Sequence, residues 1–163
     1  GIFTINEDDV KLVDDVRDVL QLSETDMTIF FRNLSFVKWN DTFDQFKEII
    51  EPAFYKLEEI KGEILIKWQL WFESYALRLQ KETLSDVERM QRMNSINAKY
   101  VLRNYMAQLA IDAADQGDYS FISELYELLK KPYAEQPDHQ KWFAKRPEWA
   151  RHKVGCSMLS CSS

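Results

Sequence analysis

Apolar residues recur every three or four positions along most of residues 1–131, and this spacing places them on one face of an α-helix. The densest apolar stripe predicts a central helix, and the stripe is wide enough to be covered on most of the helix circumference. It consists of Ile64, Leu65, Trp68, Trp71, Phe72, Tyr75, Ala76 and Leu79. No run alternates convincingly between apolar and polar residues, so the pattern predicts an all-α fold of about seven helices around one core.

Capping signals indicate where the first helices begin and end. The first helix is expected over residues 7–21, and its inward stripe would be Val10, Val13, Val16 and Leu20. Ser23 followed by Asp26 resembles a capping box for the second helix. Pro52 should kink or split the third helix, because proline lacks a backbone N–H.

Two capping boxes are possible at the start of the next helix after the central one. They are Thr83 with Asp86 and Ser85 with Glu88, since a hydroxyl and an acidic residue three positions later can each bond the other's backbone N–H. A further helix is expected from about residue 99 to residue 116.

The helical period is lost after residue 131. We therefore divide the chain into a helical bundle, residues 1–131, and a wrapping tail, residues 132–163, with at most short helical turns. Large rings in the tail are expected to anchor it on the bundle, and they are Tyr133, Trp142, Phe143 and Trp149. Arg103 and Asn104 would lie mid-helix between apolar neighbours, where a polar pair usually bonds another segment, so they are candidates for holding the tail.

Composition narrows the class of protein. A chain of 163 residues is expected to form one compact domain, and four Gly with four Pro are too few for a hairpin-rich sandwich or barrel. The net charge of −6 disfavours a general nucleic-acid binder. No apolar run approaches the roughly 20 residues that span a bilayer, so no membrane partner is expected.

Residues suited to catalysis are sparse. The four glycines are too far apart to form a phosphate-cradling loop, and no nucleophile motif accompanies His139 or His152. A zinc site of these histidines with Cys156 and Cys161 can be drawn, but its spacing matches no standard finger and no metal site is predicted. The two cysteines could be free thiols, bridge each other, or exchange with a cysteine elsewhere.

The clearest signature lies after residue 97. Its first part is the run Asn-Ala-Lys-Tyr-Val-Leu-Arg-Asn-Tyr-Met-Ala-Gln over residues 97–108. Its later parts are Pro132-Tyr133, Glu135-Gln136-Pro137, Pro147-Glu148-Trp149-Ala150 and the terminal Cys161-Ser162-Ser163. In this order they resemble the C-terminal signature of the family of selenoprotein O and its bacterial relatives. Ala98 stands where that family usually has proline.

This resemblance implies a longer protein with a kinase-like fold, which transfers AMP from ATP to Ser, Thr or Tyr hydroxyls with the help of Mg²⁺. The family's ATP- and metal-binding residues lie in an N-terminal kinase-like part, so no catalytic residue and no cofactor is assigned to this chain. Because the sequence begins at Gly1 without a methionine, it is expected to be roughly the C-terminal third. Its expected partners are the kinase-like region and, through the parent protein, protein substrates.

The resemblance also implies a redox role for the end of the chain. Cys161 matches the C-terminal cysteine or selenocysteine that the family is thought to use for redox control, whereas Cys156 has no clear match and is an alternative partner for Cys161.

The expected compartment is the cytoplasm for a bacterial protein and the mitochondrion for a eukaryotic one. The alternative reading is an independent helical module whose aromatic tail grips a protein partner.

Overall fold

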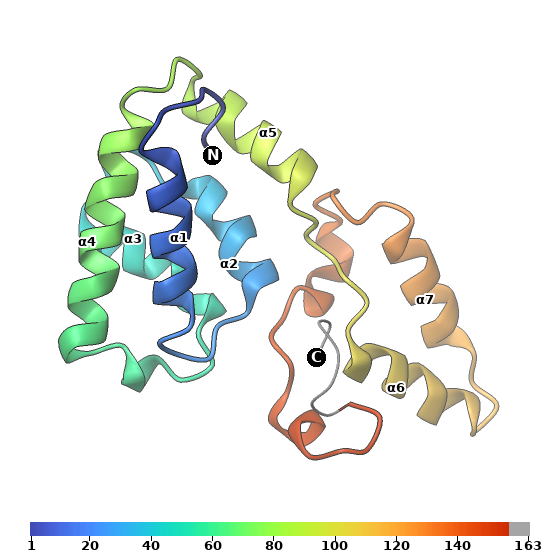
Figure 1. Cartoon of the computed structure of the whole chain (residues 1–163). Coiled ribbons are helices and arrows are strands. Elements are labelled where there is room, and N and C mark those ends of the chain that lie inside the picture. Colours follow the sequence, from blue (N-terminus) through green and yellow to red (C-terminus); the bar gives the residue numbers. More distant parts are fainter. Residues whose placement is uncertain (157–163) are drawn as a thin grey trace. The chain divides into compact units, whose positions relative to one another are not determined.

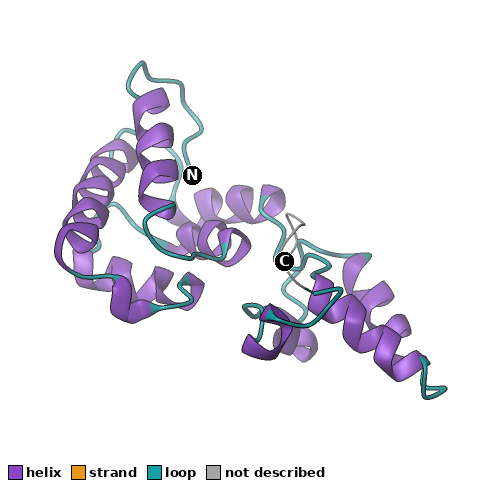
Figure 2. Cartoon of the chain, turned by 60° about the horizontal axis from the view of Figure 1, so that its bottom comes forward, coloured by secondary structure: helices purple, strands orange, loops and turns teal. Residues whose placement is uncertain are grey.

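The computed structural model describes residues 1–156, and within them the regular secondary structure is helical (Figures 1 and 2). The α-helices are α1 (Asp9–Leu20), α2 (Met27–Asn33), α3 (Phe43–Ile50), α4 (Gly62–Leu79), α5 (Asp86–Ile96), α6 (Asn104–Ala114) and α7 (Ser120–Leu129). The short 3-10 helices are η1 (Leu34–Phe36), η2 (Glu51–Ala53), η3 (Leu57–Glu59), η4 (Pro137–Trp142) and η5 (Glu148–Arg151). The prediction of an all-α chain is confirmed, and one isolated β-bridge joins Thr25 to Phe54.

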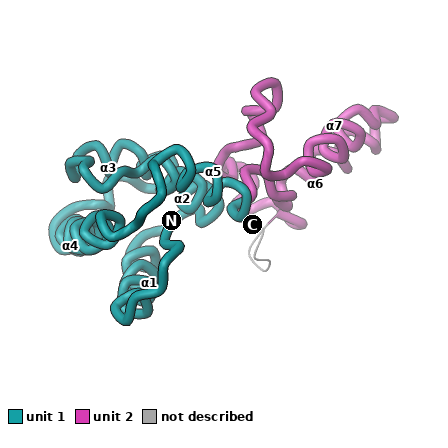
Figure 3. Tube along the Cα trace, turned by 90° about the horizontal axis from the view of Figure 1, so that it is seen from above, with its two compact units in different colours: residues 1–97 teal, residues 98–163 magenta. Residues whose placement is uncertain are grey.

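The chain forms two compact units, residues 1–97 and residues 98–163 (Figure 3). The expected division at residue 131 and the expectation of one core are therefore corrected. The reason is that α6 and α7 share a core with the tail rather than with α1 to α5. The buried members of that core are Tyr100, Tyr105, Met106, Ala110, Leu125, Leu128, Trp142, Ala150 and Cys156.

Helix α4 supplies the aromatic core of unit 1, as its dense stripe predicts. The ring of Trp68 lies 5.5 Å from that of Phe30, and the rings of Phe46 and Phe72 stack at 4.6 Å. The stripe does not cover most of the helix, however. The apolar side chains that α4 leaves more than half exposed are Ile66, Leu70 and Leu77.

Helix α1 packs along α4 (Figure 1), but through a different stripe from the expected one. Val10 and Val13 are exposed, and the buried residues of α1 are Leu12, Val16, Val19 and Leu20. Two overlapping apolar stripes run along this helix, and the one that contains both leucines buries more apolar surface. The prediction of Val10 and Val13 as core residues is wrong for that reason.

The observed caps explain several helix boundaries. Asp26 itself caps α2, since its side chain accepts a hydrogen bond from Ile29 N at 3.0 Å, so the expected box that began at Ser23 is wrong. Ser85 and Glu88 form the capping box of α5. Pro52 follows the end of α3, as expected, and lies in η2.

Candidate functional site

The tail is held on α7 by three side chains that converge on one carboxylate. Trp142 Nε1 donates a hydrogen bond to Glu124 Oε1 at 2.8 Å, and Lys141 Nζ donates to Glu124 Oε2 at 3.0 Å. His139 Nδ1 lies 3.3 Å from Glu124 Oε1. Burial alone would raise the pKa of Glu124, but the hydrogen bonds from Lys141 and Trp142 outweigh it and the pKa is lowered. Glu124 therefore stays ionised and fixes the tail.

A second attachment is made by the residues just before α6. The backbone N–H groups of Lys99 and Tyr100 both donate to Pro132 O, at 2.9 and 3.0 Å. Lys99 Nζ reaches Glu135 Oε2 and Gln140 Oε1, each at 2.8 Å. These bonds tie residues 99 and 100 to the tail, and α6 begins at Asn104 and not near residue 99.

Tyr100 reinforces this attachment from inside the core. Its ring is 1% exposed, and its hydroxyl donates to the backbone oxygens of Glu135 and Gln136 at 3.0 and 3.1 Å. Gln136 has a φ of 33°, and its side chain donates to Leu128 O and Lys131 O at the end of α7. These bonds add to the backbone hydrogen bonds that Leu128 O and Lys131 O already accept from Lys131 N and Ala134 N.

Sequence reasoning missed Lys99, Tyr100 and Glu124 as the residues that hold the tail. Lys99 and Tyr100 stand inside the run over residues 97–108 that carries the family resemblance, so a signal for them was present. Glu124 gives no such signal, because one glutamate on a helix looks like any solvated carboxylate until its partners are placed.

The expected anchoring residues occupy different environments. Trp142 is 6% exposed, whereas Tyr133 and Trp149 are 48% and 45% exposed. Trp149 meets Tyr105 edge to face with ring centroids 6.4 Å apart. Arg103 and Asn104 do not lie mid-helix as expected, because Arg103 is the buried N-cap of α6 and Asn104 its first residue.

Of the two expected redox residues, Cys156 belongs to the part of the chain that the structure describes. Cys156 is fully buried in the core of unit 2, and its thiol is free. Gly155, which precedes it, has a φ of 88°, a conformation that glycine adopts readily. Cys161 lies outside the described residues.

The described residues contain neither a metal-binding cluster nor a helix suited to cross a membrane. Among residues 1–156, no group of three or more His, Cys, Asp and Glu side chains could hold a metal ion. None of the helices in that stretch combines the length and the apolarity that crossing a membrane requires.

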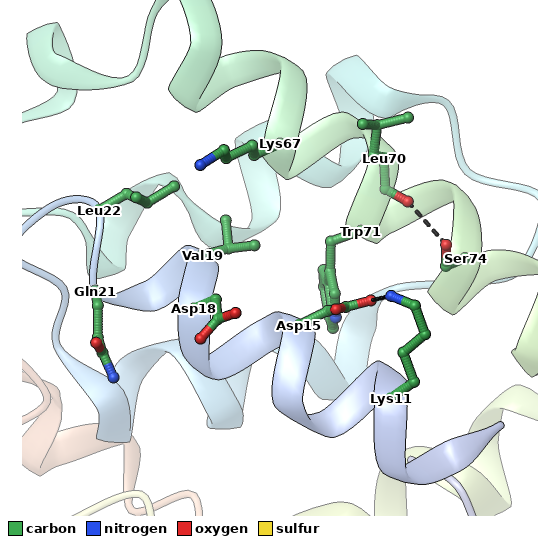
Figure 4. A pocket seen from close by; sticks show the side chains of 10 residues that line it. All are labelled: Lys11, Asp15, Asp18, Val19, Gln21, Leu22, Lys67, Leu70, Trp71 and Ser74. Carbon is green, nitrogen blue, oxygen red and sulfur yellow. Dashed lines mark hydrogen bonds and ion pairs between the residues drawn. The ribbon is translucent and has the colours of Figure 1, made fainter. Parts of the chain in front are cut away.

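Unit 1 carries an open cleft of about 690 Å³ between α1 and α4 (Figure 4). Its lining includes the buried side chains of Val19 and Trp71, and Trp71 Nε1 donates to Leu12 O at 3.1 Å. Lys11 and Asp15 form an ion pair at its edge. This geometry offers an apolar floor with charged walls, which suits binding of another chain segment.

A buried ionic cluster lies at the other end of the α1–α4 pair. Arg78 Nε donates to Asp9 Oδ1 at 2.5 Å, and Arg78 Nη1 donates to Glu82 Oε1 at 2.8 Å. The hydrogen bond from Arg78 lowers the pKa of Asp9. Burial would raise the pKa of Glu82, but hydrogen bonds from Thr4 and Arg78 lower it. The cluster is satisfied within unit 1 and serves stability.

Comparison of the sequence with known proteins points to one family. The family model described as "Protein adenylyltransferase SelO" matches residues 1–130. A protein of Flavobacterium johnsoniae named protein nucleotidyltransferase YdiU is 65% identical over 163 residues, covering 100% of this chain and 31% of that relative. Proteins of the same name from Rhodopirellula baltica and Tolumonas auensis are 46% and 45% identical, covering 97% and 96% of this chain.

These relatives are much longer than the chain, which covers 31% of the Rhodopirellula protein and 29% of the Tolumonas protein. The chain thus spans about a third of the length of the curated relatives that it matches. Because the family model matches most of the sequence and the similarity extends over nearly all of it, the chain belongs to the SelO family of protein adenylyltransferases.

Proposed function

We propose that this chain is a non-catalytic helical part of a longer protein that transfers AMP from ATP to Ser, Thr or Tyr hydroxyls of other proteins. The observation that carries the proposal is the family match over residues 1–130 in a chain that spans a third of its relatives. The four glycines stand far apart, at positions 1, 62, 117 and 155, so the phosphates of ATP would have to be held by another part of the parent. Its place as the C-terminal part stays a prediction from the sequence motifs.

The parent would use ATP and Mg²⁺, and its kinase-like region would be the main partner of this chain. The protein substrates would bind through the parent. The relatives reported above come from bacteria, which favours the cytoplasm, and the mitochondrion would apply to a eukaryotic source. No nucleic-acid partner is proposed, because the net charge of −6 would repel a phosphate backbone.

The test of this role is isothermal titration of the purified chain with ATP and Mg²⁺, beside the full-length protein. The full-length protein should bind ATP, and the chain alone should release no binding heat. Micromolar binding by the chain would overturn the proposal. An upstream reading frame that encodes nothing kinase-like would favour the alternative, an independent helical interaction module.

We also propose that Cys161 controls the parent by forming a disulfide with a cysteine of the kinase-like region. The two thiols would lose two protons and two electrons to an oxidant such as oxidised glutathione, and an S–S bond would form. Cys156 is the weaker candidate, because its thiol is buried with 0% exposure and would have to leave the core to react.

The redox role is tested in the full-length protein with Cys161→Ser and with Cys156→Ser as the matched control. Oxidation should change the mobility of the wild type and of Cys156→Ser on a non-reducing gel, and Cys161→Ser should show no change. If the shift persists in Cys161→Ser, another thiol is responsible and the proposal fails.

A further inference from the structure

A continuous groove follows the seam between α1 and α4. The cleft of Figure 4 adjoins a second one of about 290 Å³, and both are lined by Lys11, Asp15 and Ser74. The first runs towards Leu22 and Lys67, and the second towards Asp8 and Lys81. The two helices therefore run antiparallel along one groove.

Each wall of the groove is formed by one helix and the residues that flank it. The α1 wall includes Asp8, Asp9, Lys11, Leu12, Asp15, Asp18, Val19, Gln21 and Leu22, and the α4 wall includes Lys67, Leu70, Trp71, Ser74, Leu77, Arg78 and Lys81. Leu70, Ser74 and Leu77 follow one another at steps of four and three residues, which places them along one face of α4. At 1.5 Å per residue, the ten residue steps from Lys67 to Leu77 give a helical wall about 15 Å long, enough for nearly three turns of a third helix.

The groove exposes two leucines of α4 that the described residues of unit 1 leave uncovered. Leu70 and Leu77 are 57% and 61% exposed, and they line the clefts together with the buried side chains of Trp71 and Leu12. Exposed leucines seven residues apart lie on the same face of a helix, and such a face is typical of a surface that another helix covers. A helix that binds in the groove would need apolar side chains to contact these two leucines.

The charges of the two walls set the polarity of the occupant. The α1 wall has four carboxylates, Asp8, Asp9, Asp15 and Asp18, against one cation, Lys11, which is paired with Asp15. The α4 wall has Lys67 and Lys81 at its two ends and Arg78, which is paired with Asp9. A complementary helix would carry basic side chains along the edge that faces α1.

We infer that this groove receives one amphipathic helix with a basic edge, supplied by the part of the parent protein that lies outside this chain. The inference rests on the proposed function. Two thirds of the length of the relatives is outside the aligned chain, and a helix on the same polypeptide reaches the groove at a high effective concentration. A second copy of the chain lacks that advantage.

Whether a helix covers the groove is tested in the full-length protein, by alkylation with N-ethylmaleimide and peptide-resolved mass spectrometry. Leu70→Cys lies in the groove, and Gln69→Cys is the matched control on the neighbouring, exposed position of α4. We expect Leu70→Cys to react at least about tenfold more slowly, which corresponds to a protection of about 1.4 kcal/mol. Leu77→Cys repeats the measurement at the other end of the groove, in case one variant folds poorly.

Equal reaction rates for groove and control positions would overturn the inference, and so would protection that disappears on dilution, since that would mark a second copy. A zero-length carbodiimide cross-link provides the independent test of polarity. It should join Asp15 or Asp18 to a lysine outside residues 1–163, and cross-links confined to this sequence would contradict the basic edge. If AMP transfer by the wild type persists while the groove is open, the docking inference fails and the proposed function stands.

Discussion

Trp142 Nε1 donates a hydrogen bond to Glu124 Oε1 over 2.8 Å, and this contact joins the tail to α7. The indole ring also lies edge to face against Phe121, with centroids 6.1 Å apart. One residue thus supplies both apolar burial and a polar bond. Tail and helices therefore form one core in unit 2 rather than a bundle with a loose extension.

Truncating Trp142 should release the tail. Trp142→Ala removes a buried aromatic ring, which costs about 3 to 5 kcal/mol, so native-state proteolysis between residues 132 and 156 should accelerate at least about 100-fold. Trp149→Ala is the matched control, because that ring is 45% exposed and its loss should cost about 1 kcal/mol. Equal acceleration in the two variants would refute the distinction between the two rings.

Acid should weaken the same attachment. The pKa of Glu124 is lowered from its ordinary value of 4.5, so its contribution to stability is fully present above that value and is lost as the pH falls through the folded-state pKa. Between pH 6 and pH 3, the free energy of unfolding should therefore depend less on pH in Glu124→Gln than in the wild type. Glu127→Gln, an exposed change on the same helix, should leave this pH dependence as it is in the wild type.

Arg78 should matter far more than an exposed arginine. Arg78→Ala leaves the carboxylates of Asp9 and Glu82 without their partner, and breaking a buried ion pair in this way costs about 3 to 5 kcal/mol. Arg17→Ala removes an exposed pair with Asp14 and should cost about 0.5 kcal/mol or less. Urea unfolding of unit 1, followed by its tryptophan fluorescence, measures both, and similar midpoints would disprove the role of the cluster.

The capping box of α5 offers a smaller, local effect. Ser85→Ala removes the hydroxyl that accepts from Glu88 N at 3.3 Å and should cost about 1 kcal/mol. Ser95→Ala in the same helix removes an exposed hydroxyl bonded to Arg92 O and should change stability by less than about 0.5 kcal/mol. Hydrogen exchange of the first turn of α5 should rise in Ser85→Ala alone.

The residues of the tail show how far sequence reasoning reaches. Aromatic residues after Pro132 indicate that the tail must lie on a surface, and the structure provides that surface on α6 and α7. Which ring is buried is a different matter, because Trp142 and Trp149 look alike in sequence and differ in whether a polar partner such as Glu124 stands within reach of the indole N–H. Arg103 likewise looks helical by period, although it is the N-cap of α6 and the nearby Lys99 and Tyr100 are bonded to Pro132 O.

The sequence by itself determined the all-α class, the dense stripe of α4, the break at Pro52, the alternatives for capping α5 and the family. Each of these depends on residue types at short spacing, which act within one or two helical turns. Only the tertiary structure decided the division after Asn97, the inward stripe of α1, the burial of Cys156 and the groove between α1 and α4. These features depend on contacts between residues far apart in the chain, where several partners of similar polarity compete and geometry selects among them.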